Sequence, residues 1–273
     1  MEEFAKKRVL ITVKTYPTPS SKYVETVCTA GITSDGKWIR LYPIKFRFLQ
    51  DKQKYRLFSW VDVEVKKSKD DARPESYKVN SESIKVISEL HPEKDLEEKR
   101  ALLLPLCRPS LETLYDEIDT NGASLGMFKP KSVTGIKVTQ LQDREWNQDE
   151  IAKLNQMSIF DNESERKLLE KIPYRFFLEF VCNDERCPGH SISINSWEIN
   201  ETYRSFLRKY RSETEAINKL KAKWMSMFCD SCDYYLFVGT TRSHKKFIII
   251  GHLSYPLKNI RVIPGQISLY DNP

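Results

Sequence analysis

The sequence predicts an α+β protein. A β-rich N-terminal module, either barrel-like or a small antiparallel sheet, is followed by a zinc-stabilised α/β module with a long amphipathic helix. Three observations predict this fold class. Apolar and polar residues alternate along much of residues 8–90, apolar residues recur at three- and four-residue steps over 197–228, and two closely spaced cysteine pairs lie near the C-terminus. With 273 residues, the chain can bury a hydrophobic core without covalent cross-links.

Residues 1–90 are predicted to form the β-rich module. Segments rich in β-branched and aromatic residues are expected to be strands, and a hairpin turn is expected at Asp35-Gly36 because glycine tolerates the positive φ of tight turns. In the strand that follows, Trp38, Arg40 and Tyr42 alternate with apolar residues and therefore share one face.

Residues 91–170 are predicted to be a connector of helices and a strand. Two helices are expected, interrupted at 105–109 by prolines, with Ser110 as the N-cap of the second and Gly122 ending it. A loop and a strand follow over 123–141, and the polar segment 146–173 is expected to be helical in part.

Residues 171–273 are predicted to form the zinc-binding module. A strand over 174–182 delivers the first cysteine, a single amphipathic helix capped by Ser196 or Asn195 spans 197–228, and two strands close the unit.

Composition and charge bound the function. The chain is 40% hydrophobic and 30% charged, the N-terminus lacks the pattern of a secretory signal, and the longest apolar run is only Phe247–Ile250. A cytoplasmic location is therefore expected, with no membrane contact. The net charge of +6 favours a polyanionic partner, although a solvated basic surface explains it equally well. The basic residues are densest over 201–223.

The cysteine pairs predict a metal site. Cys182-x4-Cys187 and Cys229-x2-Cys232 have the spacing of two zinc knuckles, and paired cysteines in a reducing compartment more often hold metal than form disulfides. His190 is a fifth candidate ligand, so four cysteines are the favoured set and His190 is the alternative. A closed set of this kind stabilises structure and does no chemistry.

Aromatic and basic residues predict a nucleic-acid-binding surface, because rings stack on bases while Lys and Arg neutralise phosphates. The candidates are Trp38, Arg40, Tyr42, Lys45 and Arg47, with Arg242, Lys245 and Lys246 adding phosphate contacts. DNA or RNA is the expected partner, and a protein partner is left open. The other interpretation is that the rings are core residues covered by the arginine stems.

A metal-dependent nuclease or other hydrolase is the alternative function. Asp62, Glu64 and Lys66 share one face of a predicted strand. Glu64 and an upstream acid such as Asp35 would provide two carboxylates for Mg²⁺, and Lys66 would orient or activate water. A half-exposed structural strand shows the same alternation. His190 with Glu198 is a second catalytic candidate, for acid–base work beside the metal. Whether the protein is an enzyme is left open.

Several segments resemble a family of uncharacterised bacterial proteins. They are the stretches SLGMFKPK, FVCNDERCPGH, SWEINETYR and YYLFVGT, together with VCTAGITSDGKWIRLYPIKFR in the N-terminal part. The resemblance covers both halves of the chain and implies a place among bacterial antiviral or mobile-element genes. It brings no known activity, and it favours nucleic acid as the partner.

Overall fold

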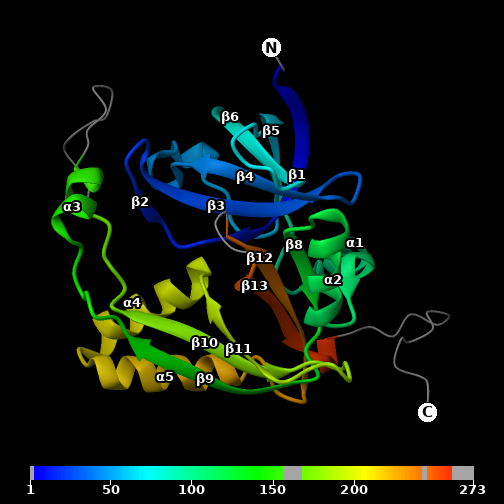
Figure 1. Cartoon of the computed structure of the whole chain (residues 1–273), viewed down its shortest axis with the longest axis vertical. Coiled ribbons are helices and arrows are strands. Elements are labelled where there is room, and N and C mark those ends of the chain that lie inside the picture. Colours follow the sequence, from blue (N-terminus) through cyan, green and yellow to red (C-terminus); the bar gives the residue numbers. More distant parts are fainter. Residues whose placement is uncertain (1–2, 156–167, 242–244, 260–273) are drawn as a thin grey trace.

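The computed structural model describes residues 3–155, 168–241 and 245–259. Two β units are stacked, with the N-terminal one above the other in the view of Figure 1. The N-terminal strands are β1 (Ala5–Lys14), β2 (Thr18–Ser20), β3 (Val24–Thr33), β4 (Trp38–Ile44), β5 (Ser59–Lys67) and β6 (Ser76–Glu89). This confirms the mixed α+β class and the β-rich N-terminal module.

The N-terminal unit is a five-stranded barrel. The strands run in the order β1-β5-β6-β4-β3, and β1 also pairs with β3, which closes the sheet and leaves β2 attached at its margin. The barrel interior holds alternate strand residues such as Val9, Ile11, Ile39 and Val63, as the two-residue side-chain period requires. Not every pair is antiparallel, because β4 and β6 run parallel.

The second unit is a seven-stranded sheet in the order β7-β8-β12-β13-β11-β10-β9. Its strands are β7 (Cys107–Arg108), β8 (Leu125–Phe128), β9 (Ser132–Gln140), β10 (Tyr174–Val181), β11 (His190–Ile194), β12 (Cys232–Thr240) and β13 (Phe247–Pro256). Three of them lie in the segment 91–170 that was predicted to be a connector, so that segment is built into the sheet.

Five helices are described. They are α1 (Leu96–Leu103), α2 (Leu111–Asn121), α3 (Gln148–Leu154), α4 (Trp197–Tyr210) and α5 (Glu213–Met225). Ser110 caps α2 by accepting a hydrogen bond from the Thr113 amide, and Gly122 ends it in the left-handed region, both as predicted. No helix in the described ranges is long and apolar enough to cross a membrane.

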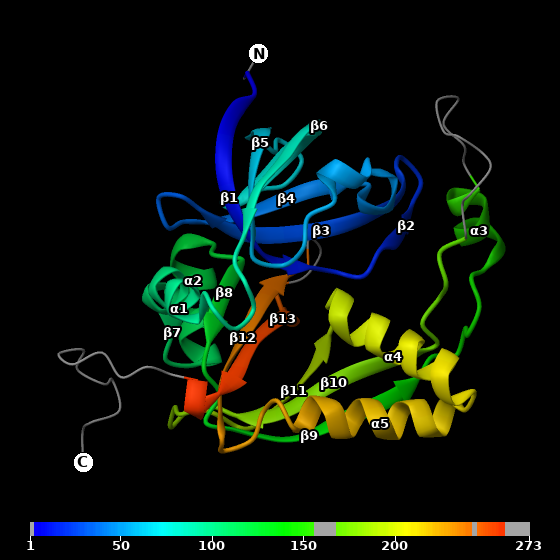
Figure 2. The ribbon, with the colours of Figure 1, turned by 180° about the vertical axis from the view of Figure 1, so that it is seen from behind.

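The predicted single helix over 197–228 is two helices. Arg211 has a φ of 57° and ends α4, and Ser212 caps α5 through the Glu215 amide. The apolar period continues through this turn because both helices bury residues in one core, including Tyr203, Leu220 and Trp224. A periodicity that reflects a shared core cannot by itself distinguish one helix from two. Figure 2 shows both helices on one side of the lower sheet.

The two units share a hydrophobic core. Leu10 and Val13 of β1 and Ile32 of β3 point outward from the barrel and join Met127 and Phe237 of the second sheet in one buried cluster. Burial of this kind stabilises the folded state by about 1.5–3 kcal/mol for each large apolar side chain. The relative position of the two units is therefore fixed by apolar packing.

Arg211 provides a test of the helix break. Arg211→Gly is expected to raise the free energy of unfolding by about 0.5–1 kcal/mol. Glycine adopts a positive φ without the steric cost that a Cβ imposes, and this gain is partly offset by the greater conformational freedom of glycine in the unfolded chain. Lys209→Gly, inside α4, is the matched control and should lower it by about 1 kcal/mol. Urea unfolding measures both, and equal destabilisation by the two substitutions would contradict the left-handed turn.

Candidate functional site

Four potential metal ligands meet between α2 and the β10–β11 hairpin. Ligand atoms of Glu112, Cys182, Cys187 and His190 all lie within 4.8 Å of one another. This is the one group of three or more such residues found among the described parts of the chain. The group includes three of the five predicted ligands and one residue that was not predicted.

The hairpin positions the two cysteines and the histidine. Cys182 directly follows β10, and its amide donates a hydrogen bond to Cys187 Sγ at 3.1 Å. Gly189 has a φ of 80°, which a residue with a side chain rarely adopts, and it turns the chain into β11. His190 then pairs with Phe180 across the hairpin, and the two rings lie 5.0 Å apart between centroids.

Glu112 reaches the group from the first turn of α2. Its Oε1 lies 2.8 Å from His190 Nε2. The N-cap residue Ser110 also donates its hydroxyl to Asp184 Oδ2 at 2.8 Å, so the start of the helix is tied to the loop between the cysteines. In the sequence, Glu112 is marked only by its place in the helix predicted after Ser110. An acidic residue is common in a first turn, and nothing in its spacing points to a partner seventy residues away.

The electrostatics suit a bound cation. Burial raises the pKa of the Cys182 thiol to about 12, so the thiol stays protonated at neutral pH unless a bound cation displaces the proton. Burial also acts to raise the pKa of Glu112, but hydrogen bonds from its own amide and from His190 outweigh it, and the net pKa is lowered. Its other oxygen, Oε2, is buried and makes no regular hydrogen bond among the described residues, and the Cys182 thiol is near enough to this carboxylate to help lower its pKa. A buried carboxylate beside two sulfurs and an imidazole fits a metal.

The second cysteine pair is not part of this group. Cys229 lies between α5 and β12, Cys232 is the first residue of β12, and their Sγ atoms are 3.2 Å apart. Cys229 Sγ also contacts the Ser231 hydroxyl at 3.1 Å. The structure therefore does not bring the four predicted cysteines together, and Glu112 and His190 complete the group instead.

The residues of the predicted N-terminal nucleic-acid surface are distributed over different environments. The Trp38 ring packs against Phe237, and Arg40 is only 3% exposed. Arg47 forms an ion pair with Glu25 at 3.2 Å, and the Lys45 ammonium lies 5.9 Å from the centroid of the Phe48 ring. Tyr42 is 44% exposed and is the only one of the five classed as exposed.

The remaining predicted phosphate contacts lie in the β12–β13 connection. Lys245 and Lys246 are exposed, and Lys245 Nζ lies 3.9 Å from Asp119. Arg242 and its neighbour His244 fall outside the described residues.

The predicted nuclease residues lie on the outer face of β5. Asp62 is held by Arg8 through two hydrogen bonds of 2.7 and 2.9 Å, and Glu64 accepts from Asn80 at 3.0 Å. Lys66 Nζ lies 4.8 Å from the Phe4 ring centroid. Asp35 pairs with Lys37 in the hairpin turn. In the described ranges, these acids belong to no cluster of three ligands, and the nuclease hypothesis stays a prediction.

Glu198 is not the partner of His190, which contacts Glu112 instead. Glu198 Oε2 is buried at the start of α4 without a hydrogen-bond partner in the described structure, and burial raises the pKa of the Glu198 carboxyl. The nearby Lys14 packs on the Phe46 and Trp197 rings, with Nζ 3.8 and 4.4 Å from their centroids. Burial lowers the pKa of Lys14 to about 8. These two residues belong to the junction between the units.

Basic residues are concentrated on the α4–α5 hairpin. None of its six cations has an ion-pair partner in the described part of the chain: Arg208, Lys209, Arg211, Lys219, Lys221 and Lys223. Two aromatic rings lie among them. The Phe206 and Tyr210 centroids are 5.8 Å apart, Lys209 and Lys219 approach the Tyr210 ring, and Lys223 approaches the Phe206 ring. We call these eight residues the basic helical surface.

Two family models match the chain. The model described as domain of unknown function DUF8758 matches residues 5–105, and the model described as domain of unknown function DUF8757 matches residues 108–273. The junction between the matches lies between the two sheets. The predicted resemblance to an uncharacterised family is thus confirmed, and no activity comes with it. No curated protein matches the chain.

Metal content of cysteine and histidine variants tests the ligand group. Cys182→Ser and His190→Ala are expected to lose most of the bound metal, because each removes a ligand atom from the cluster. Cys229→Ser should keep the metal content of the unmodified protein, because its thiol lies in the separate pair. Elemental analysis of purified protein, with circular dichroism as a check of folding, gives the answer. Equal loss in Cys182→Ser and Cys229→Ser would show that both pairs share one ion.

Proposed function

We propose that this chain is a zinc-containing nucleic-acid-binding protein. The chain belongs to the DUF8757 domain family and also carries a DUF8758 domain. The observation that carries the binding function is the basic helical surface, whose cations lack ion-pair partners in the described structure. The metal supports the fold that presents this surface.

Zinc is the metal that the donor set favours. Two cysteine sulfurs, an imidazole and a carboxylate are the kinds of ligand that zinc, a borderline-soft ion, takes in tetrahedral sites, whereas Mg²⁺ and Ca²⁺ prefer oxygen ligands. In this proposal Cys182, Cys187, His190 and Glu112 would all hold the ion. No ligand position is then left for water, so the ion contributes folding free energy and performs no reaction.

The basic helical surface suits a phosphate backbone. A cluster of like charges on a two-helix hairpin raises the local concentration of anions, and release of counterions from nucleic acid adds to the binding free energy. Most of the cations are exposed, and their long, flexible side chains can adjust to a nucleic-acid backbone of variable conformation. This favours contacts that do not depend on base sequence.

The two rings on that surface favour single-stranded regions. Phe206 and Tyr210 are half-buried, so one part of each ring packs on the protein while the rest lies near solvent among the lysines. Unpaired bases stack on such rings, and each stacked base contributes about 1–3 kcal/mol. Duplex DNA offers its phosphates to the same cations but not its base faces. A role in bacterial defence stays a prediction from the family resemblance.

Charge reversal tests the surface. The double substitution Lys209→Glu and Lys219→Glu is expected to weaken binding of single-stranded DNA or RNA by about 10- to 100-fold at low salt. It should also reduce the slope of log K against log salt by about 1.5, since two phosphate contacts are lost. Fluorescence anisotropy with a labelled oligonucleotide measures both.

The matched control is Lys52→Glu with Lys94→Glu. These lysines are exposed on other parts of the molecule, and the change of net charge is the same. If the control weakens binding as much as the helical variant, the effect comes from overall charge and the proposed surface is wrong.

Cobalt substitution tests the metal assignment. Protein loaded with Co²⁺ should show the intense visible bands of tetrahedral coordination and the near-ultraviolet bands of thiolate ligands. Glu112→Gln is expected to change the visible bands and keep the thiolate bands, because it alters only the oxygen ligand. Removal of zinc by a chelator should lower the melting temperature. A spectrum without thiolate bands would exclude the two cysteines as ligands.

A further inference from the structure

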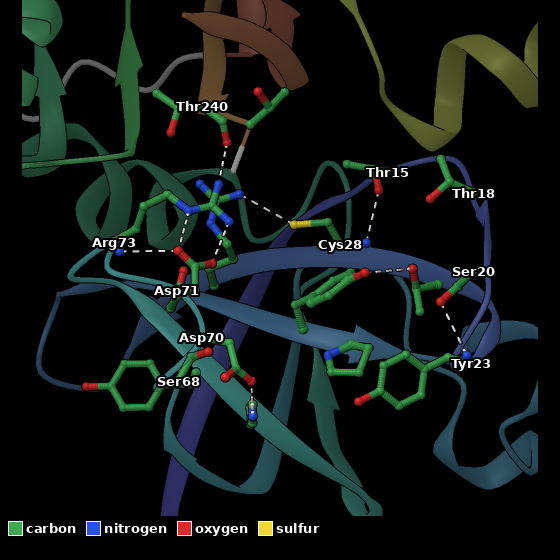
Figure 3. Close-up of a pocket in the computed structure, with 18 of the residues that line it drawn as sticks. Thr15, Thr18, Ser20, Tyr23, Cys28, Ser68, Asp70, Asp71, Arg73 and Thr240 are labelled. Atoms are coloured by element: carbon green, nitrogen blue, oxygen red, sulfur yellow. Dashed lines mark hydrogen bonds and ion pairs between the residues drawn. The ribbon is translucent and has the colours of Figure 1, made fainter. Parts of the chain in front are cut away.

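A cavity of about 520 Å³ lies between the barrel and the second sheet. Barrel strands β3, β4 and β6, the segment before β3 and the connection between β5 and β6 form most of its wall. The second unit contributes Thr240, Ile248, Ile250 and their neighbours. Figure 3 shows Thr240 facing Arg73, with Cys28 and Tyr23 on other sides of the cavity. The size is in the range of sites for small organic ligands.

Arg40 is a buried cation in the wall of this cavity. It is 3% exposed, and its guanidinium donates to the Ser124 carbonyl at 2.9 Å and to Cys28 Sγ at 3.5 Å. Its Nε has no hydrogen-bond partner among the described residues, and no ion pair joins it to a carboxylate there. The neighbouring Glu75 carboxylate accepts its hydrogen bonds from Ser124 instead. A buried charge without a counter-charge is costly, so this site favours an anion.

Ser76 lies beside Arg40 on the wall of the cavity. It is paired with Arg40 across the parallel β4–β6 contact and is also 3% exposed. Its buried hydroxyl is near enough to the Asp71 carboxylate to lower the pKa of that carboxyl, so it is not a free donor. Both residues line the cavity, and of the two Arg40 is the one that offers a donor to an anion. A guanidinium N–H matches an oxygen of a phosphate.

The other charged residues of the wall leave a positive excess. The two carboxylates are already paired, Asp71 with Arg73 and Asp70 with Lys78. Arg40 and Lys22 are the remaining cations of the wall, and Lys22 is exposed at its margin. Electrostatics therefore favour a ligand with about two negative charges.

The rest of the wall is aromatic and aliphatic. Tyr23, Tyr42 and Tyr77 line the cavity together with Pro43 and the two isoleucines of β13. Tyr42 is 44% exposed, and its hydroxyl accepts a hydrogen bond from the Thr26 hydroxyl at 3.2 Å. These side chains suit a planar ring, and Arg40 suits an anion, so a ligand that combines the two matches the lining of the cavity.

We propose that this cavity binds a single nucleotide, with its phosphate at Arg40 and its base against the tyrosines. The site is distinct from the basic helical surface and does not depend on it. A free nucleoside monophosphate and the phosphorylated end of a nucleic-acid strand both offer a phosphate and a base in this arrangement.

Calorimetric titration of the zinc-loaded full-length protein tests the proposal. The probes are the nucleoside monophosphates, the matching nucleosides and inorganic phosphate. At least one monophosphate is expected to bind at least about 10-fold more tightly than its nucleoside and than phosphate alone, because only it supplies both groups. Equal affinity for nucleotide and nucleoside, or no binding of any monophosphate at millimolar concentration, would overturn the proposal.

Variants locate the site. Arg40→Gln should weaken nucleotide binding by about 10- to 100-fold, since a charge-assisted hydrogen bond is lost. If this buried substitution prevents folding, Lys22→Ala and Tyr42→Ala carry the test, because both side chains are exposed and line the cavity. Lys52→Ala is the control away from the cavity. Unchanged affinity in folded Arg40→Gln, or in both exposed variants, would exclude this cavity.

Two further titrations separate the sources and the sites. A short oligonucleotide with a 5′-phosphate is compared with the same oligonucleotide without it, and a preference for the former identifies a strand end as the ligand. Preference for the free monophosphate over both identifies a small-molecule site. The Lys209→Glu, Lys219→Glu variant should bind monophosphate normally. Loss of monophosphate binding in that variant would place the nucleotide on the helices instead of in the cavity.

Discussion

The strand β1 is buried on both faces, and the arrangement of the molecule depends on this. From Val9 to Val13 every side chain is buried. Val9 and Ile11 fill the barrel, whereas Leu10 and Val13 contact the second sheet, so a single strand belongs to two cores. A register shift of one residue would exchange the two sets. The cavity and the buried Arg40 lie at this junction, because the outer face of the barrel becomes an internal surface only where the second sheet covers it.

Much of the fold was predictable from local patterns, and the errors have a common origin. The hairpin at Gly36, the cap at Ser110 and the interruption between α1 and α2 depend on neighbouring residues, and all are present. The closure of the barrel through β1 and β3, and the incorporation of β7 to β9 into the second sheet, depend on pairing between distant segments. Alternation along a strand shows which residues share a face, but not what covers that face.

The same distinction applies to the candidate sites. Cys182, Cys187 and His190 are close in sequence and could be grouped from spacing alone, whereas Glu112 is positioned by the tertiary fold. Cys229 and Cys232 have equally good spacing but lie outside the group. Trp38 and Arg40 were correctly placed on one strand face, yet their face is covered by Phe237 and Ser124. An aromatic residue beside a cation has the same sequence pattern on a binding surface and at a domain junction.

Glu112 also changes what a metal ion would do during folding. An ion held only by residues 182–190 would close a short local turn, and the chain would lose little conformational freedom. With Glu112 in the set, the ion joins segments about seventy residues apart, and the enclosed loop includes β8, β9 and the described parts of the segment up to β10. The entropy of closing a loop grows with the logarithm of its length. An ion held by these residues would act as a long-range cross-link, comparable to a disulfide that closes a loop of that length.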